Sequence, residues 1–104
     1  MSLNKLTIKE AQTGLRNRLF SSVELTQACL LRIRENNHNL NAFITVSEQV
    51  AMAQAQKADK MLIENQAQPL TGIPFAVKDA ICTAGVLSTG SSKILENYTP
   101  PFDA

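Results

Sequence analysis

Two short apolar segments on either side of a helical segment constrain the fold of this chain most. Residues 42–46 and 73–78 are rich in β-branched and aromatic side chains, which favours strands. Residues 48–65 between them carry apolar side chains at helical spacing and many alanines. Because a parallel strand pair needs a crossover connection, this order predicts an α/β fold with one strand–helix–strand unit.

Two further helices are predicted ahead of this unit, over residues 8–19 and 22–35. Each begins with a capping box, in which a Thr or Ser is followed three residues later by Glu: Thr7 with Glu10, and Ser21 with Glu24. The apolar stripe of the first helix consists of Ile8, Ala11, Leu15 and Leu19. Gly14 lies within this helix, where it costs about 1 kcal/mol relative to Ala or marks a close helix contact.

The ends of the later elements are also predicted from local chemistry. The Asn-rich run over residues 36–39 is expected to stop the second helix, because Asn tolerates left-handed backbone. Ser47 is expected to cap the third helix. Residues 80–97 are expected to form an ordered loop with a short helix around Lys93, capped by Ser91 or Ser92.

The length of the chain sets its domain organisation. A sequence of 104 residues is enough for one domain and not for two. Two strands are too few to complete a buried parallel sheet. We therefore expect residues 1–104 to be a single N-terminal portion of a larger domain, with a truncated sheet.

Composition excludes several classes of function. Ten Lys and Arg against nine Asp and Glu give a net charge of +1, which argues against a polybasic nucleic-acid clamp. One His and two Cys are too few for most self-contained zinc sites. The sequence has neither a run of about 18 apolar residues nor a signal-peptide layout, so we expect no membrane contact and a cytoplasmic location.

Lys78 is the strongest candidate for catalysis. It ends the apolar segment 73–78 and is followed at once by Asp79 and a glycine-containing loop. Ligands of open α/β sheets bind at the carboxyl ends of strands. Desolvation there disfavours a charged amine, and a neutral lysine can act as a base. The alternative is a lysine that reaches solvent or pairs with Asp79.

Other reactive residue types have simpler structural explanations. Residues 85–93 resemble a phosphate-binding loop only loosely, because two serines separate the second glycine from Lys93. Ser91 and Ser92 are more readily explained as helix caps than as nucleophiles. His38 is expected on a solvated turn, whereas Cys29 and Cys82 are expected to be small buried side chains.

Residues 70–79, Leu-Thr-Gly-Ile-Pro-Phe-Ala-Val-Lys-Asp, resemble the entry strand of the amidase signature family. In that family the pattern G-x-P-x-x-x-K-D supplies the lysine of a Ser–cis-Ser–Lys triad. The resemblance implies that Lys78 is this lysine and that the fold is a mixed sheet covered by helices. Residues 81–85 and 91–104 are similar to the A subunits of glutamyl-tRNA(Gln) amidotransferases, although Ala80 stands where those proteins usually have Asn.

This resemblance implies an activity for the complete protein. Glutamine would be hydrolysed, and its ammonia would convert Glu-tRNA(Gln) to Gln-tRNA(Gln). Partner subunits B and C and Glu-tRNA(Gln) are implied. ATP and Mg would be used by a partner, with no cofactor or metal in this chain. Because neither serine of the triad matches a residue of this sequence, we expect residues 1–104 to be inactive alone. No substrate-binding residue is identified.

Two alternatives stay open at this point. The chain is compatible with a fragment of an amidase that acts on free small amides. It is also compatible with a non-catalytic helical interaction module, which would self-associate through exposed strand edges or helix faces.

Overall fold

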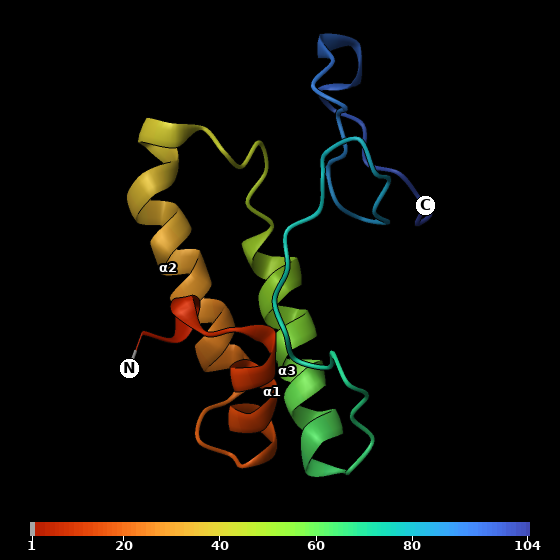
Figure 1. The fold of residues 1–104 in the computed structure, drawn as a ribbon. Coiled ribbons are helices and arrows are strands. Elements are labelled where there is room, and N and C mark those ends of the chain that lie inside the picture. The colour runs from red at the N-terminus through yellow and green to blue at the C-terminus, as the bar shows by residue number, and fades with distance from the viewer. Residues whose placement is uncertain (1) are drawn as a thin grey trace.

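A computed structural model describes residues 2–104, and three α-helices dominate it (Figure 1). The helices are α1 (Ile8–Arg16), α2 (Ser22–Leu40) and α3 (Glu48–Ile63), and two short 3-10 helices are η1 (Leu3–Lys5) and η2 (Lys93–Leu95). α2 and α3 pack against each other, and η1 contacts α2. The residues after α3 turn back along the helices and lead to a C-terminal part that stands apart from them (Figure 1).

The predicted α/β fold is wrong for the part of the chain that the structure describes. Neither residues 42–46 nor residues 73–78 form a strand, and the one β-type pairing is an isolated bridge between Thr83 and Val86. A strand needs a neighbour to share its hydrogen bonds, and within residues 2–104 neither segment makes ladder hydrogen bonds to another segment. The strand edges on which self-association was predicted are therefore also absent from residues 2–104.

A side chain replaces sheet pairing in residues 42–46, whereas the backbone N–H groups of residues 75–78 stay without a partner in the described part of the chain. The Asn37 side chain accepts a hydrogen bond from the Phe43 backbone N–H at 2.8 Å and donates one to its carbonyl oxygen at 2.9 Å. Pro74 has no N–H, and Phe75 is 82% exposed. The strand propensity of these segments did not produce strands, because propensity does not supply a partner.

Both predicted capping boxes are confirmed. The Thr7 hydroxyl accepts from the Glu10 N–H at 3.1 Å and the Glu10 carboxylate accepts from the Thr7 N–H at 2.9 Å, with the same exchange between Ser21 and Glu24. Ser47 is the N-cap residue of α3, as predicted, but its side chain makes no capping hydrogen bond. Local pairs of donors and acceptors therefore define where α1 and α2 begin.

The helix ends differ from the predicted ones. α1 stops at Arg16 because Arg18 adopts a left-handed backbone with φ 56°. Arg18 N–H then donates to Leu15 at 3.2 Å and Leu19 N–H to Gly14 at 2.9 Å, which is the Schellman pattern. α2 continues through the Asn run and ends where Asn41 becomes left-handed with φ 50°.

The core of the helical part comprises Ala11, Leu15, Phe20 and Leu25, with Leu3, Leu6, Leu62 and Ile73 packed against it. Two members of the predicted stripe of α1 are outside it, since Ile8 is 59% and Leu19 69% exposed. The left-handed turn at Arg18 turns Phe20 inward in place of Leu19. Gly14 marks a close contact with the turn after α1 and not with another helix, because a Cβ built on it would overlap two ring atoms of Phe20.

A carboxylate from α3 joins the helices at the N-terminus of α2. Asp59 accepts hydrogen bonds from the Ser22 N–H at 2.6 Å and the Val23 N–H at 3.1 Å. These amides are among the first of α2, which have no partner within the helix, and a negative charge there is favourable.

The connection after α3 is tied to α1 and α2. Gln12 donates to the carbonyl of Pro69 at 2.5 Å, Arg16 to that of Gln68 at 3.3 Å, and the Ser22 hydroxyl to that of Gly72 at 2.9 Å. Gly72 has φ 87°, and an added Cβ would lie 3.1 Å from Leu15. The chain is thus anchored up to residue 73, immediately ahead of the segment that carries Lys78.

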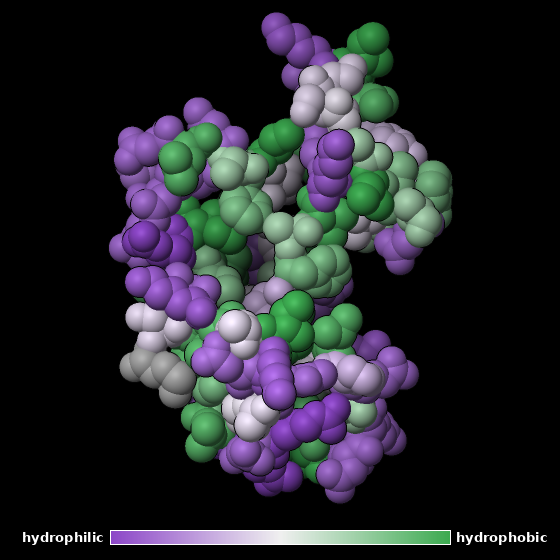
Figure 2. All heavy atoms as spheres, viewed as in Figure 1, coloured by the Kyte–Doolittle hydropathy of each residue, from purple (hydrophilic) through white to green (hydrophobic). Residues whose placement is uncertain are grey.

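Apolar surface remains uncovered on both sides of that segment. Figure 2 shows hydrophobic residues gathered where the helices face the C-terminal part, with hydrophilic residues mostly below. Val77, Ile81 and Leu31 are among the exposed large apolar residues. No helix within residues 2–104 is both long and apolar enough to cross a membrane.

Candidate functional site

Lys78 lies at the end of an extended, exposed segment. The desolvation expected at this position is not seen, because residues 75–78 are all exposed. Among residues 2–104, the Lys78 ammonium makes neither a hydrogen bond nor an ion pair, so the lysine reaches solvent, as in the alternative interpretation, and does not pair with Asp79. The amine is accessible to any group that approaches this segment.

The Asp79 carboxylate closes the loop that follows Lys78. One carboxylate oxygen accepts from the Thr89 N–H at 2.9 Å, and the other accepts from the Ser91 N–H at 3.1 Å and from the Thr89 hydroxyl. The main-chain carbonyl of Asp79 accepts from the Gly90 N–H at 3.1 Å. We call residues 79–91, closed in this way, the Asp79 loop.

These contacts stabilise the ionised form of Asp79. The hydrogen bond from the Thr89 hydroxyl is the largest influence that lowers the pKa of the Asp79 carboxyl below its ordinary value, followed by that from the Thr89 N–H. The Ser91 and Gly90 amides act in the same direction. Asp79 therefore acts as an acceptor only and does not supply a proton near neutral pH.

Residues after the Asp79 loop fold back onto it. The Gly85 N–H donates to the carbonyl of Pro100 at 3.0 Å, and the Ser88 N–H donates to that of Tyr98 at 3.0 Å. Asp103 accepts from the Ala84 N–H at 2.7 Å. Ser88, Thr89 and Pro100 are buried within this part, which explains how a segment with so little regular secondary structure is held together.

The serines of this region have structural roles. Ser91 has a left-handed backbone with φ 60°, and its N–H donates to Asp79. The Ser92 hydroxyl accepts from the Ile94 N–H at 3.3 Å, which confirms the expected cap of the short helix η2. Neither hydroxyl is hydrogen-bonded to Lys78.

The side chains of the remaining sequence candidates make no hydrogen bond to Lys78 within residues 2–104. His38 is exposed in the last turn of α2. Cys29 and Cys82 are free and half-buried, and burial raises the pKa of the Cys29 thiol. Within residues 2–104, His, Cys, Asp and Glu side chains form no group of three that could hold a metal.

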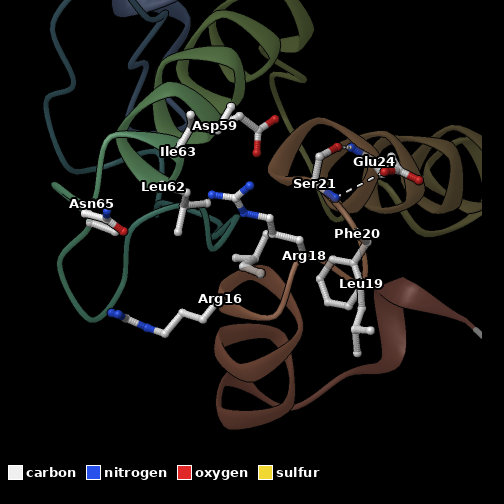
Figure 3. A pocket seen from close by; sticks show the side chains of 12 residues that line it. Arg16, Arg18, Leu19, Phe20, Ser21, Glu24, Asp59, Leu62, Ile63 and Asn65 are labelled. Atoms are coloured by element: carbon white, nitrogen blue, oxygen red, sulfur yellow. Dashed lines mark hydrogen bonds between the residues drawn. The ribbon is translucent and has the colours of Figure 1, made fainter.

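A hollow lies between the turn after α1 and the end of α3, away from the Asp79 loop in the sequence (Figure 3). Its volume is about 790 Å³, and Leu15, Phe20 and Leu62 are among its apolar lining residues. The Arg18 guanidinium extends toward Leu62 and Asp59 in Figure 3. The carboxylates of this hollow already accept backbone N–H groups at the start of α2, so it is a packing feature between helices and offers no reactive pair.

Asp79 and Thr89 are the functional candidates that sequence reasoning missed. Asp79 was considered only as an ionic partner of Lys78, whereas its carboxylate binds backbone ten and twelve residues further along the chain. The sequence feature that could have indicated this contact is the turn-forming sequence Thr89-Gly90-Ser91 downstream of Asp79. Carboxylates commonly accept hydrogen bonds from the backbone N–H groups of turns.

Comparisons with known proteins bear directly on this arrangement. The family model "Amidase" matches residues 24–104. The glutamyl-tRNA(Gln) amidotransferase A subunit of Desulfatibacillum aliphaticivorans is 49% identical over 104 residues, which is all of this chain and 21% of the relative. The proteins of the same name from Dehalococcoides mccartyi strain CBDB1 and Granulibacter bethesdensis are 47% and 48% identical over 98% and 99% of this chain. The chain thus spans about a fifth of the length of these curated relatives.

Proposed function

Because this chain belongs to the amidase family, we propose that it forms the lysine-bearing N-terminal part of a glutamyl-tRNA(Gln) amidotransferase A subunit. The observation that carries this proposal is the similarity over the whole chain at 47–49% identity to relatives that bear this name. The family match by itself begins at residue 24 and fits any amidase.

In the proposed reaction Lys78 is the base. A nucleophilic serine attacks the side-chain amide carbon of glutamine while its proton passes through a bridging serine to the Lys78 amine. Ammonia leaves with a returned proton, and water then hydrolyses the acyl-enzyme to glutamate. Backbone N–H groups would stabilise the oxyanion.

The lack of a partner for Lys78 is compatible with this role. Its amine makes no hydrogen bond or ion pair among residues 2–104, so a serine elsewhere in the complete protein could approach it. Burial by the remainder of the protein would then be needed to favour the neutral amine that acts as a base. Residues 1–104 would contribute the base and not the nucleophile. Loss of the nucleophile removes nearly all rate from a covalent mechanism, so these residues alone should release no ammonia.

The partners follow from the same assignment. Ammonia would pass to a partner protein that activates Glu-tRNA(Gln) with ATP and Mg, and we assign no ATP or metal site to residues 1–104. Subunits B and C are the proposed partners, and the cytoplasm is the proposed location.

A hybrid protein tests the proposal. It joins residues 1–104 to the remainder of the Desulfatibacillum aliphaticivorans relative and is assembled with the partner subunits of that organism. Ammonia released from glutamine and Gln-tRNA(Gln) formed from Glu-tRNA(Gln) are both measured. We expect Lys78→Ala to abolish both activities and Lys57→Ala, a change of an exposed lysine on α3, to preserve them.

The outcomes separate the competing assignments. Full activity in the Lys78→Ala hybrid would refute the role of Lys78. Hydrolysis of simple amides such as propionamide, without any amidation of Glu-tRNA(Gln), would indicate an amidase of free small amides instead.

A further inference from the structure

We propose that Asp79 is a positioning residue, which fixes Lys78 for catalysis by closing the Asp79 loop. This inference rests on the proposed function, because it assumes that Lys78 is the base. Asp79 itself would contact neither substrate nor the reacting atoms.

The first argument is where the backbone around Lys78 is held. No backbone N–H between residues 74 and 78 makes a hydrogen bond within the described part of the chain. The Lys78 carbonyl, in contrast, accepts from the Ile81 N–H at 2.9 Å, and the next carbonyl accepts from the Gly90 N–H at 3.1 Å. Lys78 is therefore anchored from its C-terminal side, by the Asp79 loop.

The second argument is the concentration of hydrogen bonds on one side chain. Both carboxylate oxygens of Asp79 are used, and their donors come from Thr89 and Ser91 on the far side of the loop. Thr89 is 6% exposed, so water has little access to its two donors, although Asp79 is half-buried and Ser91 is exposed. Hydrogen bonds to a charged acceptor are about twice as strong as neutral ones.

The consequence for catalysis follows from geometry. A catalytic base must lie within hydrogen-bond reach of the proton it accepts, and a displacement of about 1 Å can cost roughly 100-fold in rate. Lys78 has a long, flexible side chain, so its amine holds a defined position only if the Lys78 backbone is fixed. Opening the loop would release that backbone while leaving the amine chemically intact.

Variants of the hybrid protein test the inference. We expect Asp79→Ala to lower kcat for glutamine hydrolysis by about 10- to 100-fold. The matched control is Asp103→Ala, because Asp103 also accepts a backbone N–H in this region but is not attached to Lys78. We expect the control to retain kcat within about 3-fold.

Thr89 provides a second test that keeps most of the packing. Thr89→Ser retains the hydroxyl that donates to Asp79, and Thr89→Val removes it at nearly constant shape. We expect Ser to retain most of kcat and Val to lose it. Equal losses in both variants, or an unchanged kcat in Thr89→Val, would overturn the inference, because the hydroxyl that donates to Asp79 would then not be what sets kcat.

A cycle with Lys78→Ala separates positioning from general support of the fold. If Asp79 acts only through Lys78, Asp79→Ala should not lower the residual rate of the Lys78→Ala hybrid any further. An equal fold-loss in both backgrounds would overturn the positioning role. A wild-type kcat in Asp79→Ala, with Lys78→Ala inactive, would also overturn the positioning role. An active Lys78→Ala hybrid would instead refute the proposed function itself.

Amide hydrogen exchange in residues 1–104 tests loop closure without any activity. We expect the Thr89 and Ser91 amides to be protected, and Asp79→Ala to remove that protection without changing exchange in α2. Rapid exchange of both amides in the unmodified chain would overturn the geometric basis of the inference.

Discussion

Substitution of Gly14 by Ala tests the packing of α1 most directly. Helix propensity alone favours Ala over Gly by about 1 kcal/mol in the interior of a helix. The structure predicts the opposite sign, because the added Cβ would overlap the Cε2 and Cζ atoms of the Phe20 ring. Phe20 is buried in the core next to Leu15 and Leu25, so the ring has little room to move.

The expected magnitude combines two opposing effects. Overpacking of a filled core typically costs about 1–3 kcal/mol, and expelling the ring would forfeit part of the roughly 3–5 kcal/mol that a buried Phe contributes. After the propensity gain, we expect Gly14→Ala to lower the free energy of unfolding by about 1–3 kcal/mol. In a chain of this size each 1 kcal/mol lowers Tm by about 4–8 °C.

Thermal and urea denaturation followed by circular dichroism measures this effect. Thr13→Ala is the matched control, since Thr13 is exposed on the same helix and its substitution should stabilise by about half a kcal/mol. In a Phe20→Leu background the overlapping ring atoms are absent, so Gly14→Ala should become neutral or stabilising. A gain of about 1 kcal/mol from Gly14→Ala in both backgrounds would refute the packing argument.

Three further predictions concern charge and backbone conformation. Asp59→Ala should lower the free energy of unfolding by about 1 kcal/mol in urea titrations, because it removes the carboxylate that accepts the first amides of α2; no loss would contradict that capping role. Arg18→Gly should raise it by roughly 0.5–1 kcal/mol, because glycine adopts φ 56° without the steric cost of a side chain; a lower Tm would argue against the left-handed turn. Since the pKa of Asp79 is lowered on folding, closure of the Asp79 loop should be fully present above about pH 4 and be lost as pH falls through that lowered pKa. Amide protection of Ser91 measured against pH follows this loss, and protection that persists unchanged to about pH 2 would contradict it.

Features of the fold that depend on neighbours in sequence were predictable. The capping boxes of Thr7 and Ser21 each involve residues three positions apart, and the structure contains both. A close contact at Gly14 was one of two interpretations of a glycine inside a helix, although Phe20 in the turn after α1 makes it and not another helix. The α-helices occupy the periodic segments, but α1 ends earlier than predicted because Arg18 adopts a left-handed backbone. This conformation usually occurs at Gly or Asn, so the sequence did not indicate it.

Features that depend on distant partners were not predictable in the same way. Residues 42–46 and 73–78 have strand propensity, yet a strand also needs a neighbour, and no local pattern shows whether one is present. Asn37 takes the backbone bonds of Phe43 that a strand would have taken. Lys78 was predicted at the end of a strand, whereas the structure shows it at the end of an exposed segment that forms no strand. The hydrogen bonds of Asp79 beyond it were not foreseen.

The unpaired segment that carries Lys78 has a consequence for limited proteolysis. Proteases bind their substrates as extended strands through backbone hydrogen bonds, and residues 74–78 already have this form with their amides unused. Phe75, a chymotrypsin site, is exposed to solvent. No hydrogen bond joins residues 2–73 to residues 79–104, so one cut after Phe75 would separate the helical part from the Asp79 loop and the residues that follow it. The rate of that cut would thus measure how well a binding partner shields the approach to Lys78.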